Sequence, residues 1–241
     1  MDLLDISVVR DYGDVLLKGL LTTVLLTFIV IILAGILGIP VALARLARAR
    51  WIRLLADLYV EFIRGTPLIL QLLYIYYVLP SIGIRLEPFT AAVIGLTANY
   101  TAYMSEVYRS GIQAVPRGQV EAANSLALSP LLAFRLIVLP QAFRIVLPAL
   151  GNYLIALFKD TALASVVTVQ ELMFTGQIIS ARSYQYFTVY TITGILYFAV
   201  SYPAALFVRR LEGRARAGWG PSSPQVAAPS PTLPKVRDQP T

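Results

Sequence analysis

The sequence contains no cysteine and no histidine. Without these residues the chain cannot form a disulfide, bind a metal through thiolate or imidazole ligands, or use a cysteine nucleophile or a histidine base. We therefore expect no catalytic residue, no metal site and no cofactor. An intramembrane enzyme would need a Ser–Lys pair or two facing acids; Asp57 and Glu61 lie four residues apart, but no second acidic cluster accompanies them.

Charged residues are scarce. They make up 14% of the chain, against about 25% in soluble domains, while 57% of the residues are hydrophobic and the mean hydropathy is +0.70. This composition predicts an all-α protein that crosses a membrane several times. The net charge of +7 does not indicate nucleic acid, because excess arginine in an apolar chain more often marks cytoplasmic loops.

Five uncharged runs are candidate membrane spans: 19–44, 65–84, 88–105, 145–158 and 183–208. The first has 26 residues, which is about 39 Å as a helix and enough to cross with tilt. The fourth has only 14 residues and is short for a span. Five spans would leave the two ends of the chain on opposite sides of the membrane.

The basic residues predict the orientation. With the N-terminus outside, 15 of the 20 lysines and arginines fall in the inside segments and 5 in the outside segments, which favours an outside N-terminus and an inside C-terminus. Residues 1–18 hold four aspartates against Arg10 and Lys18, and the apolar run that follows is too long for a secretory signal, so we expect a retained extracytoplasmic or interfacial segment. Residues 211–241 hold six prolines after position 220 and are predicted to be a disordered cytoplasmic tail.

Two regions depart from a simple alternation of span and loop. The sequence "RGTP" at 64–67 interrupts a periodic apolar stretch and predicts a helix broken within the membrane, since proline cannot continue a helix but can begin one. Glu61 and Arg64 are spaced to pair on one helix face. Further along, Lys159 and Asp160 stand inside an uncharged stretch, where ionisable residues are functional candidates. The alternative is that both charge pairs are structural.

The long loop that begins at residue 117 has an unusual content of small residues. Residues 117–128 are predicted to form a short helix with Val120 and Ala123 on one face, and Ser129 and Pro130 to cap and restart a second helix. This helix-turn-helix would lie on the cytoplasmic side. Taken alone, the pattern fits a surface for another protein or an amphipathic loop resting on lipid.

The segment "EAANSLALSPLLAFRLIVLPQA", 121–142, is similar to the EAA loop of permease subunits of binding-protein-dependent ABC importers. The family pattern is EAA, three residues, Gly, nine residues and I-x-LP. The stretches "EFIRGTPLILQLL", "YMSEVYRSGIQAVPRGQ" and "LPALGNYLIALFKDTALASV" resemble the polar-amino-acid branch. The resemblance covers 19–210 and implies a type I ABC importer fold like that of methionine permeases, in a bacterial inner membrane.

The family glycine is Ala127 in this chain. An alanine in the left-handed region costs on the order of 1–2 kcal/mol, so we expect the turn to move to Leu128 and Ser129 or residue 127 to stay helical.

The resemblance also implies partners. No lysine stands in a phosphate-binding Gly-x4-Gly-Lys-Ser/Thr loop, so a separate ABC ATPase dimer would supply the energy. In the family this ATPase binds the coupling loop, which is residues 117–140 here. The other implied partners are a second permease subunit, identical or paralogous, an extracytoplasmic solute-binding protein and membrane lipid. The residues expected to couple to the ATPase are Gly118, Glu121, Ala122, Ala123, Ala127, Ser129 and Pro140.

A polar amino acid is the implied substrate, and a zwitterion needs a cation for its carboxylate and an anion for its ammonium group. Midplane polar residues on broken helices could supply both. The candidate substrate-binding residues are Arg64, Asn99, Tyr103, Asn152, Tyr153, Lys159 and Asp160. The alternative function is a self-contained secondary transporter or channel for small polar solutes, although we find no internal repeat.

Overall fold

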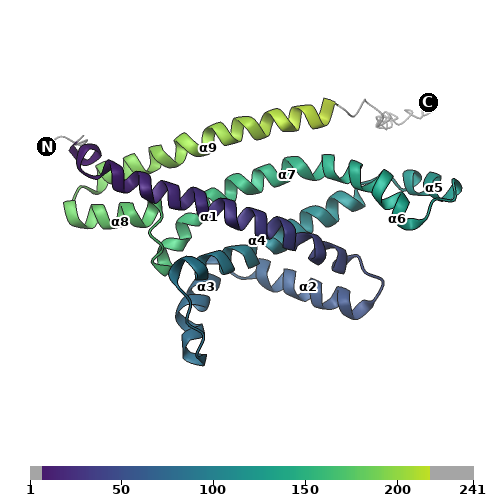
Figure 1. Ribbon diagram of the computed structural model, residues 1–241, viewed down its shortest axis with the longest axis horizontal. Coiled ribbons are helices and arrows are strands. Elements are labelled where there is room, and N and C mark those ends of the chain that lie inside the picture. The colour runs from purple at the N-terminus through teal and green to yellow at the C-terminus, as the bar shows by residue number, and fades with distance from the viewer. Residues whose placement is uncertain (1–6, 218–241) are drawn as a thin grey trace, which may run out of the picture.

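The computed structural model describes residues 7–217, and these residues form helices with no strand between them. The long helices run roughly side by side (Figure 1). The helices in chain order are α1 (Ser7–Arg45), α2 (Arg50–Gly65), α3 (Leu68–Leu73), η1 (Tyr74–Val78), η2 (Leu79–Ile82), α4 (Pro88–Gln113), α5 (Arg117–Ser125), α6 (Pro130–Ala133), η3 (Phe134–Val138), α7 (Leu139–Asp160), η4 (Thr161–Val167), α8 (Leu172–Ser183) and α9 (Tyr186–Ala217).

The core lies where α1 and α4 pack together. Small residues allow the close approach: a Cβ atom added at Gly38 would meet the Cβ of Met104 at 3.0 Å. Nearby, the hydroxyl of Tyr108 donates to the carbonyl of Gly35 at 3.1 Å. The central cluster of buried residues includes Leu26, Val30, Ala34, Leu72, Leu96, Tyr100, Met104 and Leu157. Large apolar side chains are exposed along α1 and α9, among them Leu21, Ile36, Ile195 and Phe207, as expected for faces that meet lipid.

Within residues 7–217, three helical segments are long and apolar enough to cross a membrane: Arg10–Arg45, Pro130–Val167 and Tyr186–Gly213. The pair Arg50–Gly65 and Leu68–Ile82, bent by 103°, makes a fourth if it counts as one span. The predicted span 88–105 lies in α4, which buries threonine, asparagine and tyrosine side chains among its apolar ones. The number of five spans therefore stays a prediction.

Several boundaries differ from the predicted ones. Helix α1 already begins at Ser7, so 7–18 are helical and continuous with the first predicted span. The short run 145–158 lies in the middle of a longer helical stretch from 130 to 167. The prolines that bounded it in the sequence do not end the helix: Pro140 lies in the first turn of α7, and Pro148 lies inside α7. Helix α9 continues to Ala217, so the predicted disordered tail is helical over 211–217; its remainder, 218–241, lies outside the described residues.

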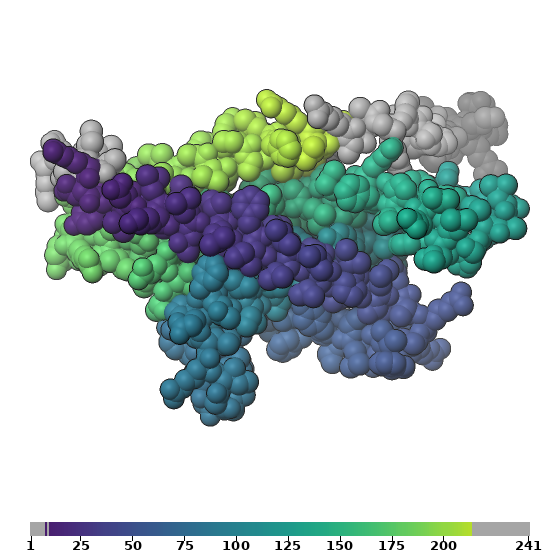
Figure 2. Space-filling model, in the orientation of Figure 1, coloured from purple at the N-terminus to yellow at the C-terminus, as the bar shows by residue number. Residues whose placement is uncertain are grey.

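The predicted helix break is confirmed. Thr66 and Pro67 both have extended backbone angles (φ −117°, ψ 144° and φ −63°, ψ 134°). The residue before a proline avoids the helical region because the proline ring crowds its backbone. The second helix begins at Leu68, one residue later than expected. Beyond the break, the axis of 68–82 bends by 103° from that of α2; α3 still packs its Leu72 into the core, and the segment after α3 projects from the body of the molecule (Figures 1 and 2).

Candidate functional site

A cavity of about 470 Å³ lies between the α2–α3 break, α4 and the end of α7. The break matters here, because it ends one helix and starts another at the cavity wall. The residues that line the cavity are Arg64, Gly65, Thr66, Pro67, Leu68, Asn99, Tyr100, Tyr103, Tyr153, Ala156, Asp160 and Leu163.

Five of the predicted substrate-binding residues share this cavity. They are Arg64, Asn99, Tyr103, Tyr153 and Asp160. A basic and an acidic side chain thus line the same space, although they come from different helices and lie almost a hundred positions apart in the chain. The cavity can accommodate a small dipolar molecule.

Aromatic rings form much of the remaining wall. The rings of Tyr100, Tyr103 and Tyr153 lie within 5.8 to 6.3 Å of one another, centroid to centroid. The guanidinium carbon of Arg64 lies 5.5 Å from the centroid of the Tyr103 ring, a cation–π contact that orients the arginine. The hydroxyl of Tyr100 donates to Asp160 Oδ2 at 2.7 Å. Tyr100 was not among the substrate-binding residues predicted from the sequence.

A glutamine joins the helix break to α4. Gln71 Nε2 donates to the carbonyl of Ile63 and to Thr66 Oγ1, both at 2.8 Å, and Gln71 Oε1 accepts from Asn99 Nδ2 at 3.0 Å. The first bond satisfies a carbonyl that the break leaves without a helical partner, as non-helical backbone at membrane depth requires. Gln71 therefore fixes the cavity wall, and the sequence analysis did not single it out.

Two predicted residues lie outside the cavity lining. Asn152 is exposed and donates to Glu212 Oε1 at 3.0 Å, toward α9. Lys159 is also exposed, because neighbouring residues on a helix point about 100° apart and its neighbour Asp160 faces the cavity. Among the ion pairs of the described residues, none joins Lys159 to Asp160 or Glu61 to Arg64. The expected pairing of Glu61 with Arg64 is therefore wrong.

The coupling loop forms the far end of the molecule (Figure 1). Glu121 and Ala122 are exposed on α5, whereas Ala123 is fully buried. Leu126 and Leu131 are 73% and 77% exposed, although both are large and apolar. Gly118 also faces open space. The loop thus presents one acidic and several apolar groups outward.

Beneath this surface the coupling loop is anchored by apolar packing. Val115, Val138 and Ala142 form a small buried cluster with Ile112 and Phe134. Ser129 stands at the predicted N-cap position of α6, although its hydroxyl makes no capping bond. Pro140 lies in the first turn of α7.

Both expectations for residue 127 are wrong, because Ala127 itself adopts the left-handed conformation with φ 53°. The amide of Ala127 donates to the carbonyl of Asn124 at 2.9 Å, and that of Leu128 donates to the carbonyl of Ala123 at 3.1 Å. These two bonds form a Schellman motif, which ends helices and places a left-handed residue at this position. The bonds and packing of the motif outweigh the cost to a non-glycine residue.

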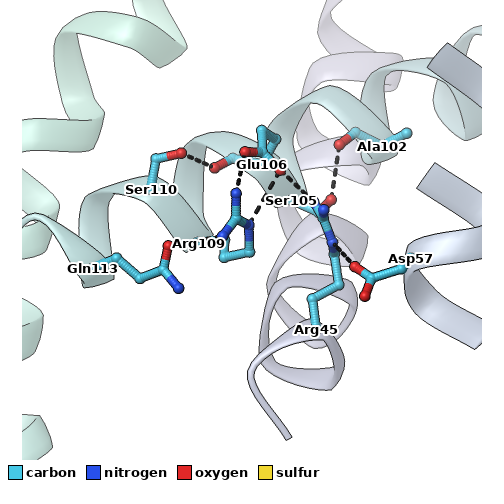
Figure 3. A network of polar contacts seen from close by, with 8 residues as sticks. All are labelled: Arg45, Asp57, Ala102, Ser105, Glu106, Arg109, Ser110 and Gln113. Atoms are coloured by element: carbon cyan, nitrogen blue, oxygen red, sulfur yellow. Dashed lines mark hydrogen bonds and ion pairs between the residues drawn. The ribbon is translucent and has the colours of Figure 1, made fainter. Parts of the chain in front are cut away.

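A network of charged residues joins α1, α2 and α4 (Figure 3). Arg45 Nε lies 2.7 Å from Asp57 Oδ1, and Arg45 Nη1 forms an ion pair with Glu106. Arg109 Nη2 lies 2.5 Å from Glu106 Oε1. Glu106 lies beyond the predicted span 88–105. The hydrogen bonds from Arg109, and to a lesser extent from Arg45, lower the pKa of Glu106 to about 2, although its partial burial acts in the opposite direction. Its carboxylate is therefore ionised across the physiological range.

A buried acid holds α8 in place. Glu171 is fully buried and caps the helix, accepting from the amides of Met173 and Phe174 at 2.8 and 2.7 Å. It also accepts from the hydroxyl of Tyr197 at 2.8 Å. Its partners account for this buried acid as a structural cap that ties α8 to α9. The sequence analysis predicted neither the helix nor the cap.

Known proteins resemble this chain over most of its length. The family described as "Binding-protein-dependent transport system inner membrane component" matches residues 32–217. A probable amino-acid ABC transporter permease protein, y4tG of Sinorhizobium fredii, is 44% identical over 82% of this chain and 85% of the relative.

Solved structures agree with the family match. A crystal structure of an amino acid ABC transporter with histidines matches with a TM-score of 0.84 and 37% identity, covering 88% of this chain and 99% of the other. An inward-facing structure of the MetNI methionine ABC transporter matches with a TM-score of 0.69 and 21% identity, covering 83% and 98%. At this identity the second match supports the fold alone. That fold is the type I ABC importer fold that the sequence predicted.

Proposed function

Since the chain belongs to the family of binding-protein-dependent transport system inner membrane components, we propose that it forms the pathway of an amino-acid importer that a separate ATPase drives. The chain is an amino-acid ABC importer permease subunit by its relatives and its structural neighbours. It carries no phosphate-binding loop of its own. The energy for import must therefore reach it through contact with another protein.

The coupling loop is the proposed contact. The outward-facing groups on and beside α5, Glu121, Ala122 and Leu126, are exposed, while the cluster around Val115 and Val138 holds the loop against α7. Small and apolar side chains allow a partner surface to approach closely, and Glu121 offers one polar anchor. Closure of an ATPase dimer would push this end of the chain, and the rigid helices would transmit the movement.

The substrate is proposed to be a zwitterionic amino acid held in the cavity. The observation that carries this proposal is that Arg64 and Asp160 line the same cavity, with three tyrosine rings between and around them. Arg64 would bind the α-carboxylate. Asp160 and the aromatic faces would bind the α-ammonium group, an arrangement suited to organic cations.

The charges of the cavity also indicate which side chain the substrate carries. The lining contains one basic and one acidic residue, Arg64 and Asp160, and the α-groups of the substrate use both. A charged side chain would have no partner inside the cavity and would carry a large desolvation cost. We therefore propose a neutral polar side chain, facing Asn99 and Tyr153.

The remaining partners follow from the exposed surfaces and the family. The segment 74–84 projects from the body (Figure 2) and exposes large apolar side chains, among them Tyr74 at 56% and Ile82 at 71%. A second permease subunit would cover it. We propose an outside N-terminus and an inside C-terminus in a bacterial inner membrane, with an extracytoplasmic binding protein that delivers the substrate.

Uptake into proteoliposomes tests this function. The complete importer, with its ATPase and binding protein, should take up a labelled neutral amino acid only when ATP is present. Unlabelled neutral polar amino acids should compete, and lysine or glutamate should compete much less. Flux through the permease alone without ATP would instead indicate a secondary transporter or channel, and strong competition by lysine would contradict the proposed side-chain class.

A further inference from the structure

We propose that Arg45 is a positioning residue that links the coupling loop to the wall of the substrate cavity. This inference rests on the proposed function, because it concerns how movement of α5 reaches the substrate. The link runs from α4 through Arg45 to α2, and α2 ends at the cavity. The residues that form the link, Arg45, Asp57, Glu106 and Arg109, are not among those that line the cavity.

The first step is the placement of Arg45 itself. Its side chain is only 8% exposed at the end of α1, and it contacts acids on two other helices, Asp57 on α2 and Glu106 on α4. A buried cation is costly unless it is paired and hydrogen-bonded. The guanidinium group meets both acids with different nitrogens, Nε and Nη1, because its donors form a planar fork. A lysine ammonium group could not reproduce both contacts in the same directions.

The second step leads from Glu106 to the coupling loop. Arg109 binds Glu106 through Nε at 3.2 Å and Nη2 at 2.5 Å, and its Nη1 donates to Gln113 Oε1 at 2.7 Å. Gln113 is the last residue of α4, and α5 begins only four residues later, at Arg117. The network therefore extends from α1 to the helix end that carries the coupling loop (Figure 3).

The third step leads from Asp57 to the cavity. Asp57 and Arg64 lie seven residues apart on α2, which is about two helical turns. A helix of this length moves as a rigid rod, so a shift at Asp57 displaces Arg64 and Thr66 at the cavity wall. Movement at the coupling loop would thus change the geometry of the substrate site.

Few other contacts hold α2 in position. Val60 is its single buried residue, and Leu54, Leu58 and Phe62 are each more than 60% exposed. Asp57 pairs with Arg45 of α1, and Tyr59 bonds directly to α4, where its hydroxyl donates to the carbonyl of Ala98 at 2.6 Å. The ion pairs of Arg45 therefore determine a large part of the placement of α2.

Distance measurements between spin labels test the link. The chain has no cysteine, so pairs of introduced cysteines report specific positions in the complete importer. One pair joins Asn124 on α5 to Phe207 on α9, and the other joins Leu58 on α2 to Phe207. All three positions are exposed. In the otherwise unchanged protein, both distances should change when ATP binds.

Arg45→Gln should separate the two responses. In this variant the α5–α9 distance should still change with ATP, whereas the α2–α9 distance should not. The stimulation of ATP hydrolysis by substrate should fall roughly tenfold, which is within the usual range of allosteric coupling. Arg45→Lys should keep only part of the stimulation of ATP hydrolysis by substrate. Arg48→Gln, which removes an exposed arginine nearby, and Tyr59→Phe, which removes the other polar link, should keep both responses.

The outcomes distinguish this inference from the proposed function. The link through Arg45 is wrong if the α2–α9 distance still changes with ATP in Arg45→Gln. It is also wrong if, in the unchanged protein, the α5–α9 distance responds to ATP and the α2–α9 distance does not. Neither result contradicts the proposed role of the coupling loop. If α5 itself does not respond to ATP, the coupling role of the loop fails, and this inference fails with it. If Arg45→Gln did not fold at all, the α5 response would also be lost in that variant. Arg45→Lys would then decide, because full stimulation of ATP hydrolysis by substrate in Arg45→Lys would overturn the link.

Discussion

The carboxylate of Asp160 at the end of α7 accepts a hydrogen bond of 2.7 Å from the hydroxyl of Tyr100 on α4. Both residues line the cavity, so this contact joins two of its walls and fixes the carboxylate of Asp160 in the lining. It also distinguishes Asp160 from its neighbour Lys159, which is exposed. The two residues form a charged dipeptide in the sequence, yet only one of them faces the proposed substrate.

Asp160→Asn should weaken substrate use without loss of the folded importer. Removing a charged hydrogen-bonding partner typically costs about 1.5–3 kcal/mol, so the KM for uptake should rise on the order of 10- to 100-fold. Lys159→Ala is the matched control and should leave KM unchanged. Equal effects of the two variants would remove the basis for assigning Asp160 to the substrate site.

Ala127→Gly should stabilise the coupling loop. Ala127 has a φ of 53°, a conformation that costs an L-residue about 1–2 kcal/mol and glycine almost nothing. Part of this gain is offset by the greater freedom of glycine in the unfolded chain. Hydrogen exchange at the Ala127 and Leu128 amides should become slower in Ala127→Gly and faster in Ala127→Val. Faster exchange in the glycine variant would mean that the left-handed turn is not formed in solution.

Glu106 predicts a pH dependence of stability. Arg109 and Arg45 lower the pKa of Glu106 from 4.5 to about 2. A lowered pKa in the folded state means that the stabilisation is fully present above about pH 4.5 and is lost as the pH falls toward 2. The difference in melting temperature between the unchanged protein and Glu106→Gln should therefore be constant above pH 5 and shrink below it. A difference that grows with acidification would contradict the ion pairs.

The sequence predicted those features of the fold that local chemistry determines. The break at 64–67 was predictable because proline and glycine act on their own backbone. The short helix that begins at Arg117 and the restart at Ser129 and Pro130 were predictable from small residues and prolines, whereas the coupling role was implied by the family resemblance alone and stays a proposal. Helix ends were less predictable: Pro148 lies inside α7, and the charged residues near 212 continue α9 where the composition favoured disorder.

The site was predictable in residue type and less so in geometry. Asn152 and Lys159 have suitable chemistry but point away from the cavity, because the face of a helix is decided by its tertiary neighbours. Tyr100 and Gln71 were missed for the same reason, since their role depends on partners sixty and twenty-eight residues away. The Arg45 network needs three helices together, and no local pattern reveals it.

We propose that this chain imports a neutral polar amino acid with energy received at the coupling loop. The most direct test is ATP-dependent uptake by the complete importer in proteoliposomes, comparing the unchanged chain with Glu121→Arg and with Gln119→Arg, an equally exposed position on α5. We predict that Glu121→Arg abolishes uptake while the complex still inserts in the membrane, and that Gln119→Arg retains most of it. Normal uptake by Glu121→Arg, or ATP-independent flux through this chain alone, would contradict the account.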